Sequence, residues 1–400
     1  MNFIVALFIF ILLLVQVVAT AILLSRLIKG AIRQPAIAPR EPTPDDLGRV
    51  SIVIPTLNEA DRLSPCLEGV TRQSYELREA IVVDSRSRDG TPELVQAAAH
   101  SDPRLRLITD DPLPAGWVGR PWALHTGFLQ SSPESEWILG LDADTRPHPQ
   151  LVASALQAAL RGGYDLISLS PQFLLESPGE IVLQPALLMT LVYRFGPTNT
   201  EAGSPERVMA NGQCFLCRRA VLERVGGYSS ARDSFCDDVT LARAIARAGF
   251  KVGFLDGANV LQVRMYEGAL ETWREWGRSL DLKDACSKAQ LWGDLGFLVA
   301  VQGLPLPILV AGAIAAAIWG VEGSLSWSKI ALLGLNGLLL AIRFALSAAI
   351  APSYDLRRSS PLTALLFWFS PLADPLAVIR IFLSSLHRPK RWRGRDYGEF

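Results

Sequence analysis

The chain has 400 residues, more than one ordinary hydrophobic core accommodates, which indicates a catalytic-size domain with further segments. Basic and acidic residues balance at 39 each, so no strongly basic surface points to a nucleic-acid partner. Half of the residues are hydrophobic, a high proportion for a soluble enzyme, and the long apolar runs lie near the two ends.

The first predicted element is a membrane-spanning anchor over residues 1–28. Residues 1–25 contain no charged residue, and at 1.5 Å per residue this run crosses a hydrocarbon core of roughly 30 Å. A cleaved secretory signal is the alternative, but its basic start and A-x-A cleavage site are missing. Arg26, Lys29 and Arg33 follow at once, so the positive-inside rule predicts that the next domain is cytoplasmic.

A proline-rich linker, residues 29–48, is expected to be extended and to lead into an α/β domain over residues 49–285. In this domain short β-rich runs alternate with helical segments, which is typical of a mostly parallel sheet. The predicted strands are Val50–Thr56, Glu79–Ser85, Arg104–Thr109, Trp137–Leu141, Asp165–Ser170, Cys214–Cys217 and Lys251–Leu255. The predicted helices are Ala60–Arg72, Thr91–His100, Pro121–Gln130 and Pro149–Arg161.

Polar side chains follow three of these strands where each strand ends, and ligands of such sheets bind at this edge. Asp142 and Asp144 are two residues apart on an extended segment, so both carboxylates can reach one hard divalent cation; a solvated turn is the alternative. Such a cation can bridge diphosphate oxygens. Asp84 can accept hydrogen bonds from a nucleobase or ribose, and a helix N-cap is its alternative.

Two acids, Asp237 and Asp238, open a predicted helix that ends at Gly249. Acids in a first helical turn often only stabilise the helix dipole. A carboxylate on the face opposite a leaving group can instead accept a proton as a general base.

The five cysteines are an odd number in a domain predicted to be cytoplasmic, which favours free thiols. Cys214 and Cys217 have the spacing of half a zinc site, but no second pair or histidine cluster accompanies them. Buried small hydrophobic side chains are therefore the favoured interpretation.

Residues 290–388 are predicted to form a C-terminal membrane region. Leu295–Val321 and Ile330–Ile350 have spanning length, and Arg343 inside the second should face protein, a water-filled pocket or a lipid head group. Pro361–Leu386 is interrupted by prolines and charges, and a third crossing would place the basic tail, residues 389–400, outside against the charge rule. A re-entrant or interfacial segment with a cytoplasmic tail is therefore preferred over a third span.

Two shorter segments of the α/β domain also have the composition of membrane-surface helices. Ile181–Phe195 is too short to span and is either part of the core or a helix in the membrane interface. Gly268–Asp284 mixes tryptophans with basic residues, which suits a helix at the level of the head groups.

Taken in chain order, these motifs resemble the family 2 glycosyltransferases with a GT-A fold. The matching pieces are SIVIPTLNE (51–59), VVDSRSRDGT (82–91), LDADT (141–145), NGQC (211–214) and CDDVTLARAIARAG (236–249). The resemblance covers the whole α/β domain and implies a nucleotide-diphosphate sugar donor, Mg²⁺ or Mn²⁺, and direct displacement with inversion.

By position in these motifs, the resemblance also assigns roles to single residues. Pro55, Glu59 and Asp84 would bind the nucleoside end of the donor, Asp142 with Asp144 the metal and diphosphate, and Asp238 with neighbouring Asp237 would supply the base. On physical grounds, and not from the resemblance, Gly116 and Gly119 would let a loop approach the donor, and Arg120 and Arg264 would contact the diphosphate. Trp117 and Trp122 either stack on a ring or pack against protein, and packing is favoured. An ordinary surface arginine is the alternative for Arg264.

Three further pieces, LPAGWVGRPWALHTG (113–127), VRMYEG (263–268) and WRGRDY (392–397), are similar to a membrane-bound, lipid-modifying branch. That branch includes hopanoid-associated, ceramide-type and carotenoid enzymes, among which the cyanobacterial carotenoid (myxol-type) 2'-O-glycosyltransferases are the nearest likeness. It implies transfer of one sugar to a lipid hydroxyl at the cytoplasmic face of a bacterial inner membrane or a thylakoid.

Two departures from the family pattern matter for this expectation. Asp84-Ser85 replaces the usual paired acids of the second motif, and the Q-x-x-R-W motif of processive synthases is absent. Glycosylation of a hopanoid or sphingolipid is the main alternative. A processive polysaccharide synthase and an inactive nucleotide-sugar-binding scaffold are weaker ones.

Overall fold

The computed structural model describes residues 3–276, 280, 282–319, 326–386, 391–392 and 395–396. The chain divides into two compact units. An α/β unit contains residues 33–174, 198–265 and the C-terminal residues 389–400, and a helical unit contains residues 1–32, 175–197 and 266–388.

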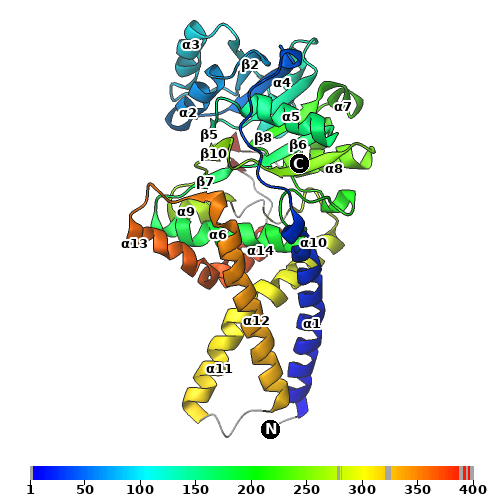
Figure 1. Ribbon diagram of the computed structural model, residues 1–400, viewed down its shortest axis with the longest axis vertical. Coiled ribbons are helices and arrows are strands. Elements are labelled where there is room, and N and C mark those ends of the chain that lie inside the picture. Colours follow the sequence, from blue (N-terminus) through cyan, green and yellow to red (C-terminus); the bar gives the residue numbers. More distant parts are fainter. Residues whose placement is uncertain are drawn as a thin grey trace. The chain divides into compact units, whose positions relative to one another are not determined.

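The α/β unit, in which Figure 1 labels β2, β6 and β8, is built on a seven-stranded sheet in the order β3-β2-β1-β4-β8-β6-β9. Only β8 runs antiparallel to its neighbours among these strands. The strands are β1 Val50–Thr56, β2 Leu77–Asp84, β3 Leu105–Thr109, β4 Trp137–Leu141, β6 Leu166–Ser170, β8 Cys214–Arg218 and β9 Val252–Asp256. The predicted α/β class with a mostly parallel sheet is confirmed, and each predicted strand lies within two residues of its observed ends.

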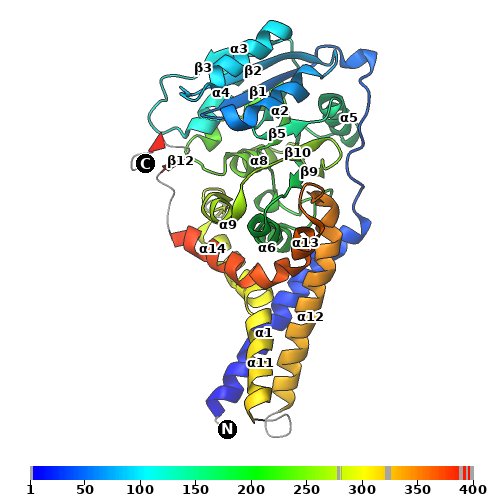
Figure 2. The ribbon, with the colours of Figure 1, turned by 90° about the vertical axis from the view of Figure 1, so that its left-hand side faces the viewer.

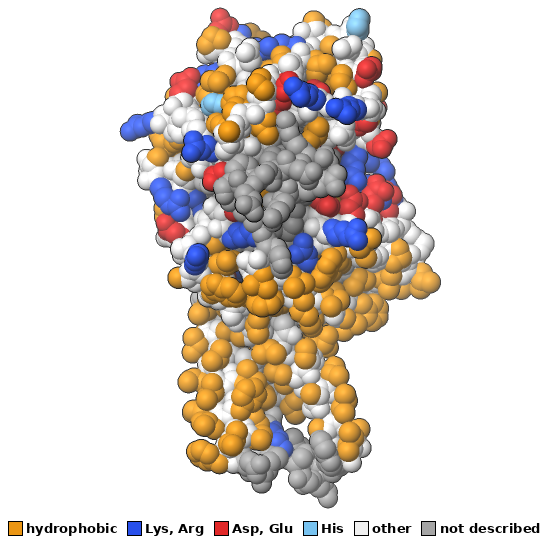
Figure 3. Space-filling view, turned by 180° about the vertical axis from the view of Figure 1, so that it is seen from behind, with side chains coloured by type: hydrophobic (Ala, Val, Ile, Leu, Met, Phe, Trp, Pro, Cys, Tyr) orange, Lys and Arg blue, Asp and Glu red, His pale blue; other side chains and the backbone are white. Residues whose placement is uncertain are grey.

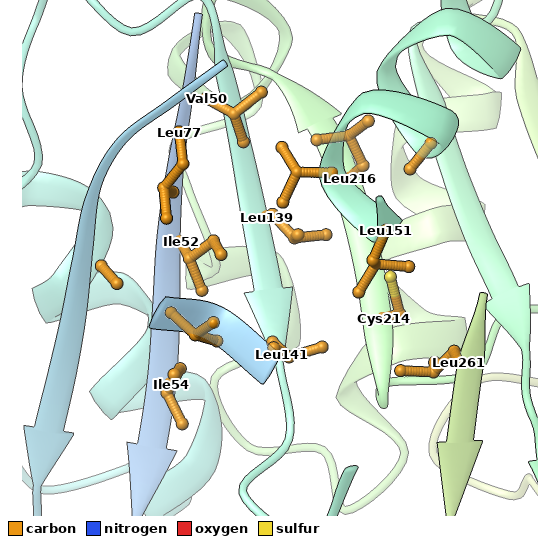
Figure 4. Packing of buried hydrophobic residues seen from close by; sticks show 14 of the residues in the cluster. Val50, Ile52, Ile54, Leu77, Leu139, Leu141, Leu151, Cys214, Leu216 and Leu261 are labelled. Atoms are coloured by element: carbon orange, nitrogen blue, oxygen red, sulfur yellow. The ribbon is translucent and has the colours of Figure 1, made fainter. Parts of the chain in front are cut away.

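Helices cover both faces of this sheet, as the alternating pattern predicts. They are α2 Ala60–Thr71, α3 Thr91–Ser101, α4 Gly119–Gln130, α5 Leu151–Gly162, α7 Arg219–Arg224 and α8 Asp237–Arg247, with short 3-10 turns at Pro44–Asp46, Pro205–Arg207 and Ser229–Ala231. Successive side chains of β1 alternate between the two cores: Ile52 and Ile54 pack on the side of α2, α3 and α5, and Val53 packs on the side of α4 and α8. Figure 4 shows the first of these cores, where side chains of β1 and β4 meet Leu151 of α5 and Cys214 of β8.

Three short strands of this unit are absent from the sequence prediction: β5 Thr145–Pro147, β7 Gln172–Leu174 and β10 Leu261–Val263. β10 pairs antiparallel with β5 and parallel with β7. Because β5 follows β4 directly, the turn containing Asp142 and Asp144 is held between two strands and does not lead straight into a helix.

The predicted extended linker lies along the α/β unit. Its backbone donates from the Ile37 amide to the Asp256 carbonyl at 2.8 Å and from the Arg40 amide to the Ser154 hydroxyl at 2.9 Å.

The helical unit contains the long apolar helices, and hydrophobic side chains cover the lower part of its surface in Figure 3. Its elements are α1 Phe3–Leu27 with a 3-10 extension Ile28–Ile32, α6 Pro178–Phe195, α9 Gly268–Glu271, a π turn Thr272–Trp276, α10 Lys288–Leu298, a π turn Val299–Gly303, α11 Pro305–Trp319, α12 Trp327–Ile350, α13 Pro361–Ala364, a 3-10 segment Leu365–Ala373 and α14 Asp374–Leu386. Short stretches at Ala351–Ser353 (3-10), Tyr354–Asp355 (β11), Arg391–Trp392 (β12) and Arg395–Asp396 (β13) complete the described elements.

Three of these helical segments are long and apolar enough to cross a membrane: Phe3–Ile32, Trp327–Ser353 and Pro361–Leu386. The stretch of spanning length predicted over Leu295–Val321 corresponds to two helical segments, Lys288–Gly303 and Pro305–Ile318, which form either a broken span or a re-entrant loop with a bend of 41° between them. Pro305 explains the break, since proline has no backbone N–H to continue the first helix. The end of the predicted span, residues 320–321, lies outside the described residues.

Arg343 faces protein, as predicted for an arginine within an apolar helix. Its side chain is 2% exposed and its Nε donates to Asp374 at 2.8 Å, while Nη1 donates to Ser347 at 2.7 Å. The pair therefore joins α12 to the start of α14.

The two candidate surface helices belong to the helical unit. Most side chains of α6 are buried, which fits the core alternative for Ile181–Phe195. In Gly268–Asp284, Trp276 is buried and its ring lies 6.4 Å from that of Tyr266. Residues 277–279 and 281 of that segment, and most of the basic tail, lie outside the described residues.

Candidate active site

The carboxyl ends of β1 and β2 are level, because Thr56 pairs with Asp84 and Pro55 with Val83. The buried Asp84 carboxylate accepts from the Thr56 hydroxyl at 3.3 Å and from the Ser87 amide at 2.9 Å. Asp84 thus closes the turn after β2 and does not cap a helix. The capping function belongs to Asp89, which accepts from the amides of Ala60 and Thr91 at the starts of α2 and α3.

Glu59 lies at the start of α2 and is 6% exposed. Its amide donates to the Thr91 hydroxyl at 2.9 Å, so the loop after β1 is joined to the loop after β2. The Cys66 thiol donates to the Asp142 carbonyl at 3.7 Å. Burial raises the pKa of Cys66 to about 12, and the charges of Asp144, Asp142 and Glu59 add to this rise. Glu59 and the turn after β4 therefore surround the same neutral thiol.

The turn after β4 carries the two predicted cation ligands. Asp142 is partly exposed, and its Oδ1 accepts from Arg120 Nε at 3.0 Å and from Arg120 Nη2 at 2.8 Å. These bonds do not use Asp142 Oδ2. Carboxylate oxygens are the ligands that Mg²⁺ and Mn²⁺ prefer, so Asp142 and Asp144 fit such an ion. Among the described residues, no group of three or more histidine, cysteine or acidic side chains is arranged to hold a metal by itself.

Arg120, at the start of α4, is the central side chain of the site. Besides Asp142 it donates through Nη2 to the Gly212 carbonyl at 2.7 Å and through Nη1 to Asp237 Oδ2. The guanidinium side chain is 12% exposed. In the structure Arg120 ties the turn after β4 to the start of α8, and its predicted contact with phosphate oxygens stays a prediction.

Asp237 and Asp238 begin α8 as predicted. Asp238 Oδ2 accepts from the Gly212 amide at 2.7 Å and Oδ1 from the Val239 amide at 2.8 Å. Burial raises the pKa of both carboxyls, and the positive charge of Arg120 opposes that rise. The protons of this acid pair are therefore held more tightly than those of an exposed aspartate.

The loop before β8 was not among the predicted site residues, although the Asn211-Gly212 turn in it is a visible signal. Asn211 exchanges hydrogen bonds with the Ser168 hydroxyl, and the Gln213 carbonyl accepts from the Asp142 amide at 3.2 Å. Gly212 is thus held from both sides, with its carbonyl on Arg120 and its amide on Asp238.

Arg264 directly follows β10, whose Val263 pairs with Thr145 in antiparallel register. The next residues in that register are Arg264 and Asp144, so Arg264 leaves the strand beside the predicted cation turn.

The tryptophans of the 113–127 motif pack among themselves, as predicted. The ring of Trp117 stacks on His125 at 5.1 Å, and the Trp122 indole donates to the Asp110 carbonyl at 2.6 Å. Gly116 has a positive φ of 78°, which suits glycine, whereas Gly119 belongs to the first turn of α4 and not to a loop.

Four of the five cysteines are buried, including Cys214 and Cys217, and all five are free thiols. Burial raises the pKa of both Cys214 and Cys217. Both thiols are neutral near pH 7, as expected of small core side chains.

The fold and this acidic edge define the class: an α/β enzyme of GT-A type, with acids at the ends of β2 and β4 and at the start of α8. Residues 51–226 match the family described as Glycosyl transferase family 2. This part of the chain is therefore similar to family 2 glycosyltransferase domains, and the protein is a glycosyltransferase.

The chain is similar to individual proteins at low sequence identity. The chain is 25% identical to the 4,4'-diaponeurosporenoate glycosyltransferase of Staphylococcus haemolyticus over 270 residues, which are 65% of this chain and 70% of that protein. It is 31% identical to Glycosyltransferase AglE of Haloferax volcanii over 132 residues, 32% of this chain, and this match spans only 41% of AglE. Among solved structures, the mannosyltransferase PcManGT from Pyrobaculum calidifontis, in complex with GDP-Man and Mn²⁺, covers 94% of this chain and 99% of its own, with 21% identity and a TM-score of 0.46.

Proposed function

We propose that the protein transfers one sugar, with inversion, from a nucleotide-diphosphate sugar to a hydroxyl of a membrane lipid. The observation that carries this proposal is the meeting of the turn after β4 with the first turn of α8 through Arg120. An inverting transfer needs its leaving group and its base on opposite sides of one reacting carbon, and these two turns supply acids for both roles.

We assign the residue roles by position in the family motifs. Pro55, Glu59 and Asp84 lie at the ends of β1 and β2 and are assigned to the nucleoside. Arg264 lies in register beside the Asp142–Asp144 turn and is assigned to the diphosphate. Asp142 and Asp144 would hold Mg²⁺ or Mn²⁺, and the ion would offset the charge that builds up on the departing nucleotide.

Asp238 is the proposed base. Hydrogen bonds from two backbone amides fix its carboxylate, so it needs little reorganisation when it accepts the proton of the attacking hydroxyl. Asp237 is already paired with Arg120 and is assigned to supporting its neighbour.

The membrane location is part of the proposal. The three candidate spans and the apolar surface of the helical unit support an integral membrane protein. Arg26, Lys29 and Arg33 follow the first span, which supports a cytoplasmic α/β domain at a bacterial inner membrane or thylakoid.

We assign Pro361–Leu386 to the membrane face and not to a further crossing. It packs along α6, and both ends of α6 lead within a few residues into the α/β unit, so α6 itself cannot cross. From Leu362 to Leu386 every third or fourth residue exposes an apolar side chain, as expected of a segment lying with one face in lipid. Figure 2 shows α13, α14 and α6 as neighbouring segments.

The acceptor proposed is a carotenoid of the myxol type, glycosylated at the 2'-hydroxyl. The name of the Staphylococcus haemolyticus relative supports a carotenoid, although it indicates a carboxylate acceptor and therefore a glycosyl ester. This gives a second candidate, transfer to a carotenoid carboxylate. A hopanoid or sphingolipid hydroxyl remains the alternative among other lipids.

Purified protein in lipid nanodiscs with MnCl₂ and labelled UDP- and GDP-sugars tests these acceptors side by side. The expected product is a single-sugar glycoside of a hydroxylated carotenoid whose anomeric configuration, read by NMR, is opposite to that of the donor. Label in hopanoid or sphingolipid but not in carotenoid contradicts the carotenoid assignment. A ladder of products contradicts single-sugar transfer.

Asp238→Asn separates the two carotenoid acceptors. A hydroxyl must lose a proton as it attacks, so its turnover should fall roughly 10²- to 10⁴-fold in the variant. A carboxylate is already ionised at pH 7 and should lose much less. Asp233→Asn, an exposed neighbour five residues earlier, is the matched control and should retain full activity. Equal turnover of Asp238→Asn and wild type on a hydroxyl acceptor excludes Asp238 as the base.

A further inference from the structure

Arg120 joins four parts of the α/β unit that are far apart in the sequence. Its own position at the start of α4 is 22 residues from Asp142, 92 from Gly212 and 117 from Asp237. Its four hydrogen bonds use most of the five N–H groups that a guanidinium has. Few donors are therefore left for a ligand.

Gly212 connects Arg120 to the proposed base, Asp238. Its carbonyl accepts from Arg120 and its amide donates to Asp238, so one peptide segment is held between the two side chains. A Cβ atom at this position would come within 2.5 Å of Arg120 Nη2 and 2.9 Å of Cζ. The guanidinium lies directly against the backbone here, so a side chain at this position would displace the end of Arg120.

We propose that Arg120 is a positioning residue, which holds Asp238 at a fixed place relative to the diphosphate end of the site at Asp142 without contacting the donor itself. This inference rests on the proposed function, in which Asp238 is the base. The planar guanidinium is essential to this positioning role. Asp142 and Asp237 accept hydrogen bonds from different nitrogens of this one rigid group, so the distance between the two carboxylates is fixed.

Lysine cannot replace Arg120 in this role. Its ammonium group has one nitrogen, which cannot lie within hydrogen-bonding distance of Asp142, Asp237 and the Gly212 carbonyl in the geometry that the guanidinium uses. Arg120→Lys keeps the charge and removes the fork. Arg104→Lys is the matched control: Arg104 also binds a carboxylate, Asp102, at 2.8 Å and three backbone carbonyls, but it lies away from the acidic edge.

Hydrogen exchange measured by mass spectrometry on the full-length variants tests positioning without any turnover. In Arg120→Lys we expect the amides of residues 208–214 and 236–241 to exchange at least tenfold faster than in wild type, whereas Arg104→Lys leaves both segments unchanged. Unchanged exchange of both segments in Arg120→Lys overturns the proposal.

Binding and turnover supply the second arm. We expect kcat of Arg120→Lys to fall about 100-fold, the size of effect that a 1 Å misplacement causes. The dissociation constants of UDP and GDP, each measured with MnCl₂, should change less than threefold. A loss of nucleotide affinity that matches the loss of kcat overturns the proposal in favour of a direct donor contact.

Gly212→Ala provides an independent variant with the charge of the site intact. The added methyl group forces Arg120 and Gly212 apart, so it should reproduce the faster exchange of residues 236–241 and the loss of kcat; wild-type behaviour in both contradicts the link. If wild type transfers no sugar to any acceptor, the proposed function fails, while the exchange experiment still decides the role of Arg120.

Discussion

At the scale of single residues, the acid pair at the start of α8 sets an expected pH dependence. Burial raises the pKa of Asp237 and Asp238, and Arg120 only partly opposes this. Because a base must be ionised, kcat/KM should fall as the pH drops, with an acidic limb well above the ordinary aspartate pKa of about 3.9. A pH series on the carotenoid acceptor measures the limb, and a limb at or below pH 4 contradicts the shift.

The raised pKa of these carboxyls also predicts how the stability of the fold depends on pH: lowering the pH favours the folded state, whereas it reduces activity. A carboxyl whose pKa is raised by folding binds its proton more tightly in the native state, so its contribution to stability is present at low pH and is lost as the pH rises through the folded pKa. Asp237→Asn should therefore flatten the decrease of the melting temperature between mildly acidic and neutral pH.

The sequence predicted these acids but not what holds them. Asp142, Asp237 and Asp238 are recognisable because they follow an apolar strand or open a helix. The contacts of Arg120 depend on the strand order, in which β8 lies beside β4 and brings Gly212 close to Asp142. No local pattern encodes a pairing across 117 residues, so the contact of Arg120 with Asp237 could not be predicted from the sequence.

At the scale of elements, the contact of α4 with β1 gives a prediction for Gly127. A Cβ atom there would lie 2.2 Å from Val53 Cγ1 and 3.0 Å from Val83 Cγ2, so Gly127→Ala must push the helix off the sheet. Overpacking of this kind costs about 1–3 kcal/mol. Thermal unfolding should show it as a lower melting temperature. Gly203→Ala is the control, since a Cβ there meets nothing within 4 Å, and equal melting temperatures for the two variants would contradict the close contact.

Strands could be predicted from the sequence where their run of apolar residues is long. β1 and β4 are almost wholly buried and appear as apolar runs in the sequence, so both were predicted with the bounds that the structure shows. β5, β7 and β10 have three residues each, too few for any periodicity to be visible, and their pairing is a tertiary effect. The bend before Pro305 was missed because hydropathy measures composition and not helix direction.

At the scale of the whole molecule, the buried pair of Arg343 and Asp374 should stabilise the helical unit without affecting the donor site. Asp374→Asn leaves the arginine charge buried without its counter-ion, which costs about 3–5 kcal/mol. The double variant Arg343→Met with Asp374→Leu removes both charges and should recover most of that loss. Arg358→Gln, which removes the more exposed pair with Glu176 (side chains 56% and 31% exposed), is the control and should cost no more than about 1 kcal/mol.

Thermal unfolding in detergent micelles and nucleotide binding, measured on the same preparations, separate the two units. Arg343 and Asp374 lie in the helical unit, whereas the acidic edge lies entirely in the α/β unit. Asp374→Asn should therefore lower the melting temperature while UDP and GDP bind as in wild type, because the site draws its contacts from its own unit. A loss of nucleotide binding at temperatures where the variant is still folded would mean that the acidic edge depends on the helical unit for its geometry.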